Sequence, residues 1–498
     1  MKSIGYQNLI ERFRLNVCEL LRKSFLGQES QNKVVEKDDG EDRYFAARRI
    51  TIDESWQSNL LFAIKYEGVN FEVLKAFFNV CDCNELANFV RSVSTGAYHR
   101  RIWFLYEFLT GRVLPIEDLK MGNYVAAIDE DVQLALPSES APKLRRYRIA
   151  NNVLGNAEFC PYVMHTDAIK EMPAVKLKQR SNELLGKYPT ELLYRAIQYL
   201  YVKETKSSFA IELETPTQKR MEGFIAVLKD ESSGTLDKAA LCEIQNRIVD
   251  ERYQQHDWRT TQVYVGETIN PTHERVHFVA VKPQDVAAFM DGFVAILDKV
   301  MATGSLDPVI LAAVMSFAFV FIHPFDDGNG RIHRYLMHYI LARFGFTPEK
   351  MIFPVSAVLI KRQKEYDRML ETFSRRLMEC IQYDMDEAGE VTVRGETADY
   401  YRFIDYTPIV SGFQRIIAET IETEWKYELD YLVSYDRMRE GMREVVDMPD
   451  KKANQFILFA NQNGGKLSQS KRKLFPELTD EEIWRMEQIV QRETKTLV

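Results

Sequence analysis

The chain has few cysteines for its length, six in 498 residues, and they are widely scattered. Such a set does not predict a disulfide framework. Cys81 and Cys83 are the closest pair, and their C-x-C spacing is not one that zinc or redox sites normally use. These features predict a reduced protein, and we expect a cytoplasmic location.

A long hydrophobic run is also missing. The longest apolar stretch, residues 308–322, is shorter than the ~20 residues that a membrane-spanning helix needs. The first residues, 1–8, lack the apolar core of a signal peptide. We therefore expect neither a membrane protein nor a secreted one.

Excess positive charge is absent as well, since the formal net charge is −8. An acidic chain has no general electrostatic attraction to nucleic acid or to an anionic membrane surface. Apolar residues make up 46% and charged residues 28% of the chain, which is ordinary for a globular protein. The length predicts roughly two to four domains.

What the chain does contain is one short segment rich in reactive side chains, HPFDDGNGRIHR at residues 323–334. Residues 335–344 follow with helical spacing and meet Gly345, so the segment is predicted to open a helix. The N-terminus of a helix binds anions through free N–H groups and a favourable dipole. The glycines of the segment allow those N–H groups to approach an anion closely.

Four side chains of this segment suit a polyphosphate ligand. Asp327 suits Mg²⁺, which takes few protein ligands besides phosphate oxygens. Arg331 and Arg334 share a helix face, and each guanidinium can fork onto phosphate oxygens. His323 is a candidate general base because imidazole titrates near neutral pH. A simple turn or a core histidine would explain single fragments of this pattern, but not the whole set.

The stretch before this segment predicts how His323 is held. Residues 308–322 are apolar on every side, which indicates a buried helix. Asp307 and Pro308 suit the N-cap and the first position of that helix. We therefore expect a central buried helix that ends at His323.

The segment also resembles the signature of the Fic family, H-[PF]-F-x-[DE]-G-N-G-R-x-x-R, at every position. Fic proteins are mostly AMP transferases, which take ATP and attach AMP to a hydroxyl group of a target protein. The related Doc-type kinases carry lysine at the position of Gly330, and phosphocholine-transferring relatives carry alanine at that of Gly328. Both differences favour nucleotidyl transfer, here to a Ser, Thr or Tyr hydroxyl, with self-modification expected.

The resemblance implies a role for each signature residue. His323 would deprotonate the target hydroxyl, Phe325 would pack under the loop, and Asp327 would bind Mg²⁺. The cradle for the α-phosphate region would be formed by Gly328, Asn329 and Gly330. The outer phosphates would be held by Arg331 and Arg334. ATP and Mg²⁺ are thus the expected substrate and cofactor.

Two β-strands are predicted upstream of the segment, at residues 261–266 and 276–281. Fic proteins carry a β-hairpin, or flap, at this position, and there it pairs with an extended segment of the target protein. Strand addition of this kind uses main-chain hydrogen bonds and makes few demands on sequence. A flap near 261–281 that docks the protein substrate is therefore expected, and a plain surface hairpin is the alternative.

A second motif resembles the inhibitory helix of Fic proteins, [ST]-x-x-x-E-[GN]. Ser208 and Glu212 match it and share a helix face, whereas Leu213 departs from it. In the family the glutamate pairs with the second signature arginine, here Arg334, and so blocks productive binding of ATP. The resemblance implies autoinhibition, and it raises removal of AMP as a second activity. An ordinary surface glutamate is the alternative.

The predicted fold class is mainly α, with a Fic-type helical core, a small β-hairpin flap, a helical N-terminal region and a C-terminal winged-helix-like unit. Four regions are expected. They are a mostly helical N-terminal domain at 1–170, the catalytic domain at 171–390 with its inhibitory helix near 205–214, a helical linker region at 391–448 and the C-terminal unit at 449–498.

Apolar periodicity predicts individual elements within these regions. Residues 9–26 are expected to form an amphipathic helix, and the polar stretch 28–42 a loop or linker. Residues 182–203 are expected to form a helix with Ser181 as its N-cap. Thr479 and Glu482 predict a capping box at the start of the last helix.

Two rival functions remain open. The signature meets phosphates rather than the base, so UTP or GTP is an alternative to ATP. Residues 463–490 have a helix–turn–helix pattern with a basic middle, which allows a DNA-binding regulator with secondary catalysis. Acidic flanks favour a plain helical subdomain there instead. A homodimer is expected by analogy with Fic proteins.

Overall fold

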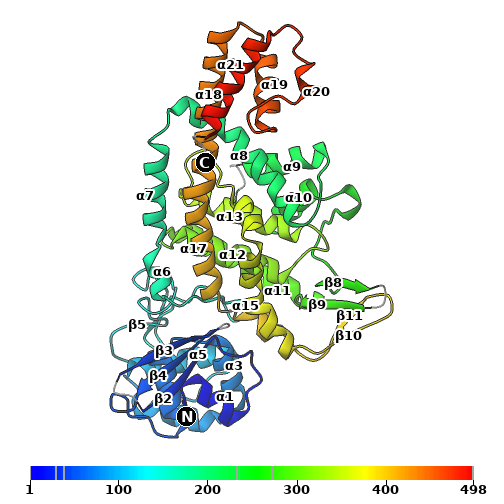
Figure 1. Cartoon of the computed structure of the whole chain (residues 1–498). Helices are drawn as coiled ribbons and strands as arrows, with labels where there is room; N and C mark the ends of the chain where they lie inside the picture. The colour runs from blue at the N-terminus through cyan, green and yellow to red at the C-terminus, as the bar shows by residue number, and fades with distance from the viewer. Residues whose placement is uncertain are drawn as a thin grey trace. The chain divides into compact units, whose positions relative to one another are not determined.

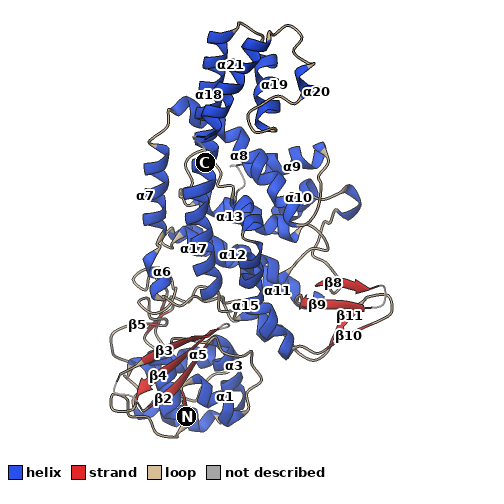
Figure 2. Cartoon of the chain, viewed as in Figure 1, coloured by secondary structure: helices blue, strands red, loops and turns tan. Residues whose placement is uncertain are grey.

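The computed structural model of the chain describes residues 2–28, 31–37, 40–230, 234, 236–270 and 273–495. The chain divides into two compact units, each assembled from three separate stretches (Figure 1). The first unit comprises residues 1–174, 216–346 and 362–415, and the second comprises residues 175–215, 347–361 and 416–498. Helices predominate over small sheets in the described residues (Figure 2), which confirms the mainly α fold class.

The first unit begins with a four-stranded sheet of order β1-β2-β4-β3, in which β2 and β4 are parallel and the other neighbours antiparallel. The strands are β1 (Lys2–Ile4), β2 (Arg22–Gly27), β3 (Lys33–Lys37) and β4 (Gly40–Ala46). Helices nearby in the chain share one hydrophobic core. They are α1 (Tyr6–Phe13), α2 (Trp56–Phe62), the π-helical turn Ala63–Glu67, α3 (Phe71–Val80), α4 (Cys83–Ser92) and α5 (Ala97–Thr110).

Two sequence expectations are wrong in this region. The helix predicted for residues 9–26 ends at Phe13, because Arg14 adopts the left-handed conformation (φ 51°), and residues 22–27 form β2 instead. The expected loop at 28–42 contains β3 and the start of β4, although residues 29–30 and 38–39 lie outside the described residues. Charged residues on these strands gave them the appearance of a solvated linker.

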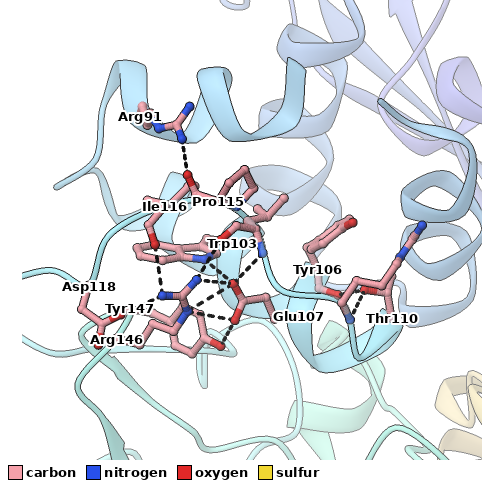
Figure 3. A network of polar contacts seen from close by, with 12 residues as sticks. Arg91, Trp103, Tyr106, Glu107, Thr110, Pro115, Ile116, Asp118, Arg146 and Tyr147 are labelled. Carbon is pink, nitrogen blue, oxygen red and sulfur yellow. Dashed lines mark hydrogen bonds and ion pairs between the residues drawn. The ribbon is translucent and has the colours of Figure 1, made fainter. Parts of the chain in front are cut away.

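A polar network centred on Glu107 of α5 orders the segment that follows this helix (Figure 3). The Glu107 carboxylate accepts hydrogen bonds from Trp103 Nε1 (2.7 Å), the Leu114 N–H (3.0 Å) and the Tyr147 hydroxyl. Arg146 donates to it through Nη2 (2.8 Å) and Nε. The short strands here are β5 (Val125–Ala126), β6 (Lys143–Leu144) and β7 (Ile149–Ala150), followed by α6 (Asp167–Glu171).

The rest of the first unit is built around α12 (Pro308–Ile322), whose side chains are almost all buried and which packs against α11 (Pro283–Thr303) and α13 (Asn329–Arg343). The Asp307 carboxylate accepts the N–H groups of Val309 (2.9 Å) and Ile310 (3.1 Å), which confirms the predicted N-cap. The other elements are α9 (Gln218–Lys229), α10 (Lys238–Ile248), the 3₁₀ turn Glu251–Tyr253, β8 (Tyr264–Asn270), β9 (His273–Val279), α15 (Gln363–Cys380), β10 (Tyr383–Met385), β11 (Val391–Val393), α16 (Ala398–Arg402) and α17 (Thr407–Glu419).

The described residues of the second unit form helices and connecting segments, without a strand. Its elements are α7 (Ala174–Leu185), α8 (Thr190–Ile211), α14 (Val355–Lys361), the π-helical turn Thr420–Trp425, α18 (Lys426–Val445), α19 (Asp450–Asn461), α20 (Gln469–Arg472) and α21 (Asp480–Lys495). The helix predicted for 182–203 is wrong at its start, since α7 and α8 are separated by residues 186–189. Ser181 is buried inside α7, so it is not the N-cap of a helix. The N-cap position of α8 is occupied by Pro189.

The C-terminal part of the second unit confirms one prediction and leaves another unconfirmed. Thr479 and Glu482 form the capping box, with the Thr479 N–H donating to Glu482 Oε2 (2.7 Å) and the Glu482 N–H to Thr479 Oγ1 (3.3 Å). Within 449–495 we find helices and no strand, so the winged-helix-like interpretation stays unconfirmed. The four expected domain boundaries stay predictions. In the described parts of the chain, none of the helices combines the length and hydrophobicity of a membrane span.

Candidate active site

His323 lies directly after α12, where the helix ends. It adopts the left-handed conformation (φ 56°, ψ 60°), and its N–H still donates to the Phe319 carbonyl (2.9 Å). The imidazole Nδ1 is 3.1 Å from the carbonyl oxygen of Val320. Because a carbonyl oxygen only accepts, Nδ1 carries the proton in the neutral ring and Nε2 keeps a lone pair. The half-buried ring can therefore take up a proton through Nε2.

The loop after His323 is closed by the side chain of Asn329. Its Oδ1 accepts the N–H of Phe325 (3.0 Å), and its Nδ2 donates to the carbonyl of the same residue (2.7 Å). The ring of Phe325 is buried and contacts Trp258 and Phe319, with ring centroids 5.3 and 6.3 Å away. Both polar ends of the Asn329 amide thus shape the loop, and the part of Asn329 in a phosphate cradle stays a prediction.

Gly328 joins this loop to α13. Its φ is +93°, and a Cβ at this position would lie 2.8 Å from Cγ1 of Val249, so both backbone conformation and space require glycine. Gly328 occupies the N-cap of α13 and has no side chain to bind the N–H groups of the first turn. That turn contains Asn329, Gly330 and Arg331, so the loop opens a helix as predicted.

The charged side chains of the segment are less exposed than the sequence suggested. Arg331 is fully buried, with Nη2 2.6 Å from Asp327 Oδ1 and Nη1 donating to the Ile248 carbonyl (3.1 Å). Arg334 is 2% exposed. Arg331 therefore orients the Asp327 carboxylate, a part that the sequence did not predict. Contact of both arginines with outer phosphates stays a prediction.

Asp327 is the residue that fits a magnesium ion. Its side chain is 33% exposed, and Arg331 holds Oδ1 while Gln245 Nε2 donates to its backbone carbonyl (3.2 Å). The described residues include no cluster of three or more His, Cys, Asp or Glu side chains arranged to hold a metal ion. Magnesium that binds phosphate oxygens needs only one or two protein carboxylates, so a single oriented aspartate suits it.

The second imidazole of the segment, His333, belongs to the core. It is fully buried, its Nδ1 lies 2.7 Å from the Ser316 carbonyl, and its ring stacks on Tyr366. Burial lowers the pKa of His333 to about 3, although the contact with Ser316 acts in the opposite direction. His333 is therefore neutral at physiological pH and packs α13 onto α12.

The segment before β8 contributes contacts that the sequence did not predict. Gln255 holds Asp326, accepting its N–H (2.8 Å) and donating to its Oδ2 (2.9 Å). Thr261 Oγ1 donates to the other carboxylate oxygen (2.7 Å), and the Arg259 N–H donates to the Pro324 carbonyl (2.9 Å). Polar residues ahead of the hairpin were the only sequence signal, and they carry no recognisable pattern.

The predicted hairpin is present, with β8 and β9 antiparallel and displaced by a few residues from the predicted strands. The tip, residues 271–272, lies outside the described residues. The pair forms a two-stranded sheet, and the side chains of β8 are largely exposed.

The residues of the inhibitory motif lie at the end of α8 in the second unit. Ser208 is buried in its last turn, and Glu212 follows directly after the helix, half-buried. Leu213 adopts the left-handed conformation (φ 58°), with its N–H donating to the Ala210 carbonyl (3.0 Å). That conformation favours Gly or Asn, the residues that the motif has at this position. Pairing of Glu212 with Arg334 stays a prediction.

Comparison with known proteins shows what the part of the chain that contains this site is similar to. The model of the Fic/DOC family matches residues 235–341. Protein adenylyltransferase fic-1 of Caenorhabditis briggsae is 39% identical over 97 residues, which is 20% of this chain and 17% of that protein. Protein adenylyltransferase Fic of Culex quinquefasciatus is 31% identical over 158 residues, 29% of this chain and 28% of that protein.

The chain thus spans less than a third of the length of these curated relatives. A solved structure of a Fic family protein from Desulfovibrio desulfuricans G20 has 20% sequence identity and a TM-score of 0.37, covering 64% of this chain and 87% of that one. The matched residues include the whole segment from His323 to Arg334 and the flap. The similarity to the Fic/DOC family therefore covers residues 235–341, the part of the chain that contains this segment and the hairpin.

Proposed function

We propose that this chain is a protein adenylyltransferase, which transfers AMP from ATP to a Ser, Thr or Tyr hydroxyl of a target protein. The observation that carries the proposal is the geometry of His323, whose Nε2 keeps its lone pair beside a loop that ends at the N-terminus of α13. The adenylyltransferase names of the relatives support it.

The reaction follows from these groups. The target hydroxyl gives its proton to Nε2 of His323 while its oxygen forms a bond to the α-phosphorus. The bond from that phosphorus to the bridging oxygen breaks, and pyrophosphate leaves. The N–H groups of the first turn of α13 stabilise the charge on the phosphate, and the general base contributes roughly 10²–10⁴-fold. Asp327 would hold Mg²⁺, which neutralises phosphate charge when bound, with Arg331 and Arg334 on the outer phosphates.

Labelled ATP tests the proposal. With Mg²⁺, label at the α-phosphate should appear on protein and label at the γ-phosphate should not. His323→Ala should lower this transfer by about 10²-fold or more, whereas His256→Ala, an exposed histidine ahead of the flap, should not. Transfer of the γ-phosphate would show a kinase instead. Unchanged α-labelling by His323→Ala would remove the proposed role of this residue.

We place the protein substrate on the flap. The exposed face of β8 and the two-stranded pairing leave an outer edge where an extended segment can add as a further strand. Self-modification is expected when a segment of the chain or of a second copy takes that place. A homodimer and a cytoplasmic location remain predictions.

We also propose that Glu212 restrains the enzyme. Its support is the motif itself and the left-handed Leu213, which gives the end of α8 the backbone that the motif's Gly or Asn would have. Glu212→Gly should raise AMP transfer or self-modification above the parent level. Glu214→Gly removes a carboxylate two residues away and should leave labelling unchanged. Equal labelling by the parent and the Glu212→Gly variant would remove this hypothesis, and loss of AMP from modified protein in the parent alone would support removal of AMP as a second activity.

Two alternatives are separated by simple assays. UTP and GTP are alternatives to ATP as the nucleotide, because the proposed loop binds phosphates rather than the base. Incubation with each labelled nucleotide separates them. A DNA-binding role for the C-terminal unit requires a duplex complex with steep salt dependence. A gel shift at low salt, with Lys471 and Arg472 replaced by alanine as the comparison, decides it.

A further inference from the structure

Arg259 connects the end of α12 to both ends of the flap. Its side chain is 2% exposed, and its Nε donates to the His323 carbonyl (2.6 Å) while Nη2 donates to that of Ile322 (3.4 Å). On the other side, Nη1 donates to the Thr261 carbonyl (2.6 Å), and Nη2 donates to that of Val281. The four acceptors are backbone carbonyls, two at the end of the helix and one at each end of the hairpin.

The chemistry of these acceptors explains why an arginine is required. The carbonyls of Ile322 and His323 end a helix and lack intrahelical donors, and a cation there is favoured by the helix dipole. Thr261 and Val281 lie before β8 and after β9, so their carbonyls flank the hairpin. A planar guanidinium donates in fixed directions to both the end of α12 and the ends of the hairpin. The donors of a lysine ammonium all lie on a single nitrogen atom.

The cation remains charged in spite of its burial. Burial lowers the pKa of Arg259 to about 10, while the charge of Asp326 acts in the opposite direction. Its hydrogen bonds all go to neutral carbonyls, and a buried cation held in this way costs free energy. Stability alone therefore does not explain a buried arginine here, because its burial costs free energy. This favours a role for Arg259 in positioning.

We propose that Arg259 is a positioning residue of the transferase. It fixes the left-handed backbone of His323 relative to both ends of the flap, so that a hydroxyl on a segment docked at β8 meets Nε2. The inference rests on the proposed adenylyl transfer for its kinetic consequence, but the geometry of His323 that it predicts does not need catalysis.

The test uses the full chain in three variants. Arg259→Ala removes the whole connection, Arg259→Lys keeps the charge but not the fork, and Arg252→Ala removes an exposed arginine on the same segment as the control. Two quantities are measured for each, the kcat and KM for labelled ATP, and the ¹⁵N chemical shifts of the His323 imidazole, which report the tautomer. Circular dichroism and the Tm confirm folding.

We expect kcat of Arg259→Ala to fall by about 10²-fold, the effect of a misplacement of about 1 Å, with the KM for ATP within about twofold. The kcat of Arg259→Lys should lie between that of the parent and that of the alanine variant. The His323 shifts should change from a single Nδ1–H tautomer toward a mixture in both variants and in neither the parent nor the control.

The proposal would be overturned if folded Arg259→Ala had the same kcat as the parent. It would also be overturned if the His323 tautomer were unchanged in both variants. If the alanine variant does not fold, the lysine variant decides in the same way. If the parent itself transfers no AMP, the proposed function fails, whereas the tautomer measurement still tests Arg259 on its own.

Discussion

Glu107 shows how much of the N-terminal region depends on one carboxylate. Its side chain is 8% exposed and accepts hydrogen bonds from Arg146, Tyr147, Trp103 and a backbone N–H. Burial alone would raise the pKa of Glu107, but the hydrogen bonds from Arg146 and the two aromatic residues outweigh it and lower the pKa. The ionised form is therefore the one that stabilises the fold.

The sign of the pH dependence follows. A lowered folded-state pKa contributes stability that is fully present above the ordinary glutamate pKa and is lost as pH falls through the folded-state value. Glu107→Gln should lower the free energy of unfolding by about 2 kcal/mol near neutral pH and flatten its decline in acid. Urea unfolding at several pH values checks this, with the exposed Glu117→Gln as control. An acid decline identical to the parent's would contradict it.

For other single residues the chemistry could be predicted from the sequence, but the protein partners of the side chain could not. Asn329 and Arg331 were expected to face a nucleotide, yet their side chains meet Phe325, Asp327 and Ile248. Residue type alone does not say whether a polar group meets ligand or protein. That choice depends on packing against α10 and the segment before β8, which are distant in sequence.

At the scale of elements, the predictions that succeeded rest on strong local signals. The buried helix 308–322 was predicted from its uniform hydrophobicity and its Asp307 cap, and the last helix from its capping box. The strands β2, β3 and β4 were missed because charged residues hid their alternation, and the parallel pairing of β2 with β4 joins residues well separated in the chain, such as Arg22 and Glu41. Long-range pairing of this kind leaves no local pattern.

The candidate site divides in the same way. The contiguous segment from His323 to Arg334 could be identified from sequence, because all its chemistry lies within one turn and one helix start. Arg259 and Gln255 could not, since their partners His323 and Asp326 lie more than sixty residues away along the chain. Hydrogen bonds to carbonyls place no demand on the sequence of the acceptor, so nothing marks them in advance.

At the scale of the whole molecule, the second unit depends on contacts among its three stretches. The Trp425 indole stacks on Phe353 (ring centroids 4.2 Å apart) and donates to the Ile352 carbonyl (3.0 Å). Glu424 pairs with Lys203 of α8 (2.7 Å) and with Lys361 of α14. The turn at 420–425 therefore joins α8 and α14 into one core.

Trp425→Ala should lower the free energy of unfolding by about 3–5 kcal/mol, because it empties a buried site and leaves the Ile352 carbonyl without its donor. Trp484→Ala, at a 60% exposed position on α21, is the matched control and should have little effect. Thermal unfolding followed by circular dichroism measures both. Similar Tm values for the two variants would show that the turn does not hold this core.

The interleaving of the two units has an evolutionary consequence. A premature stop codon before residue 416 removes the turn at 420–425 and α18 but still encodes α8 and α14, which then lose their contacts with the missing stretch. We therefore expect selection to act on these three stretches jointly. Recombination among relatives is expected to exchange them as a linked set rather than as a detachable tail.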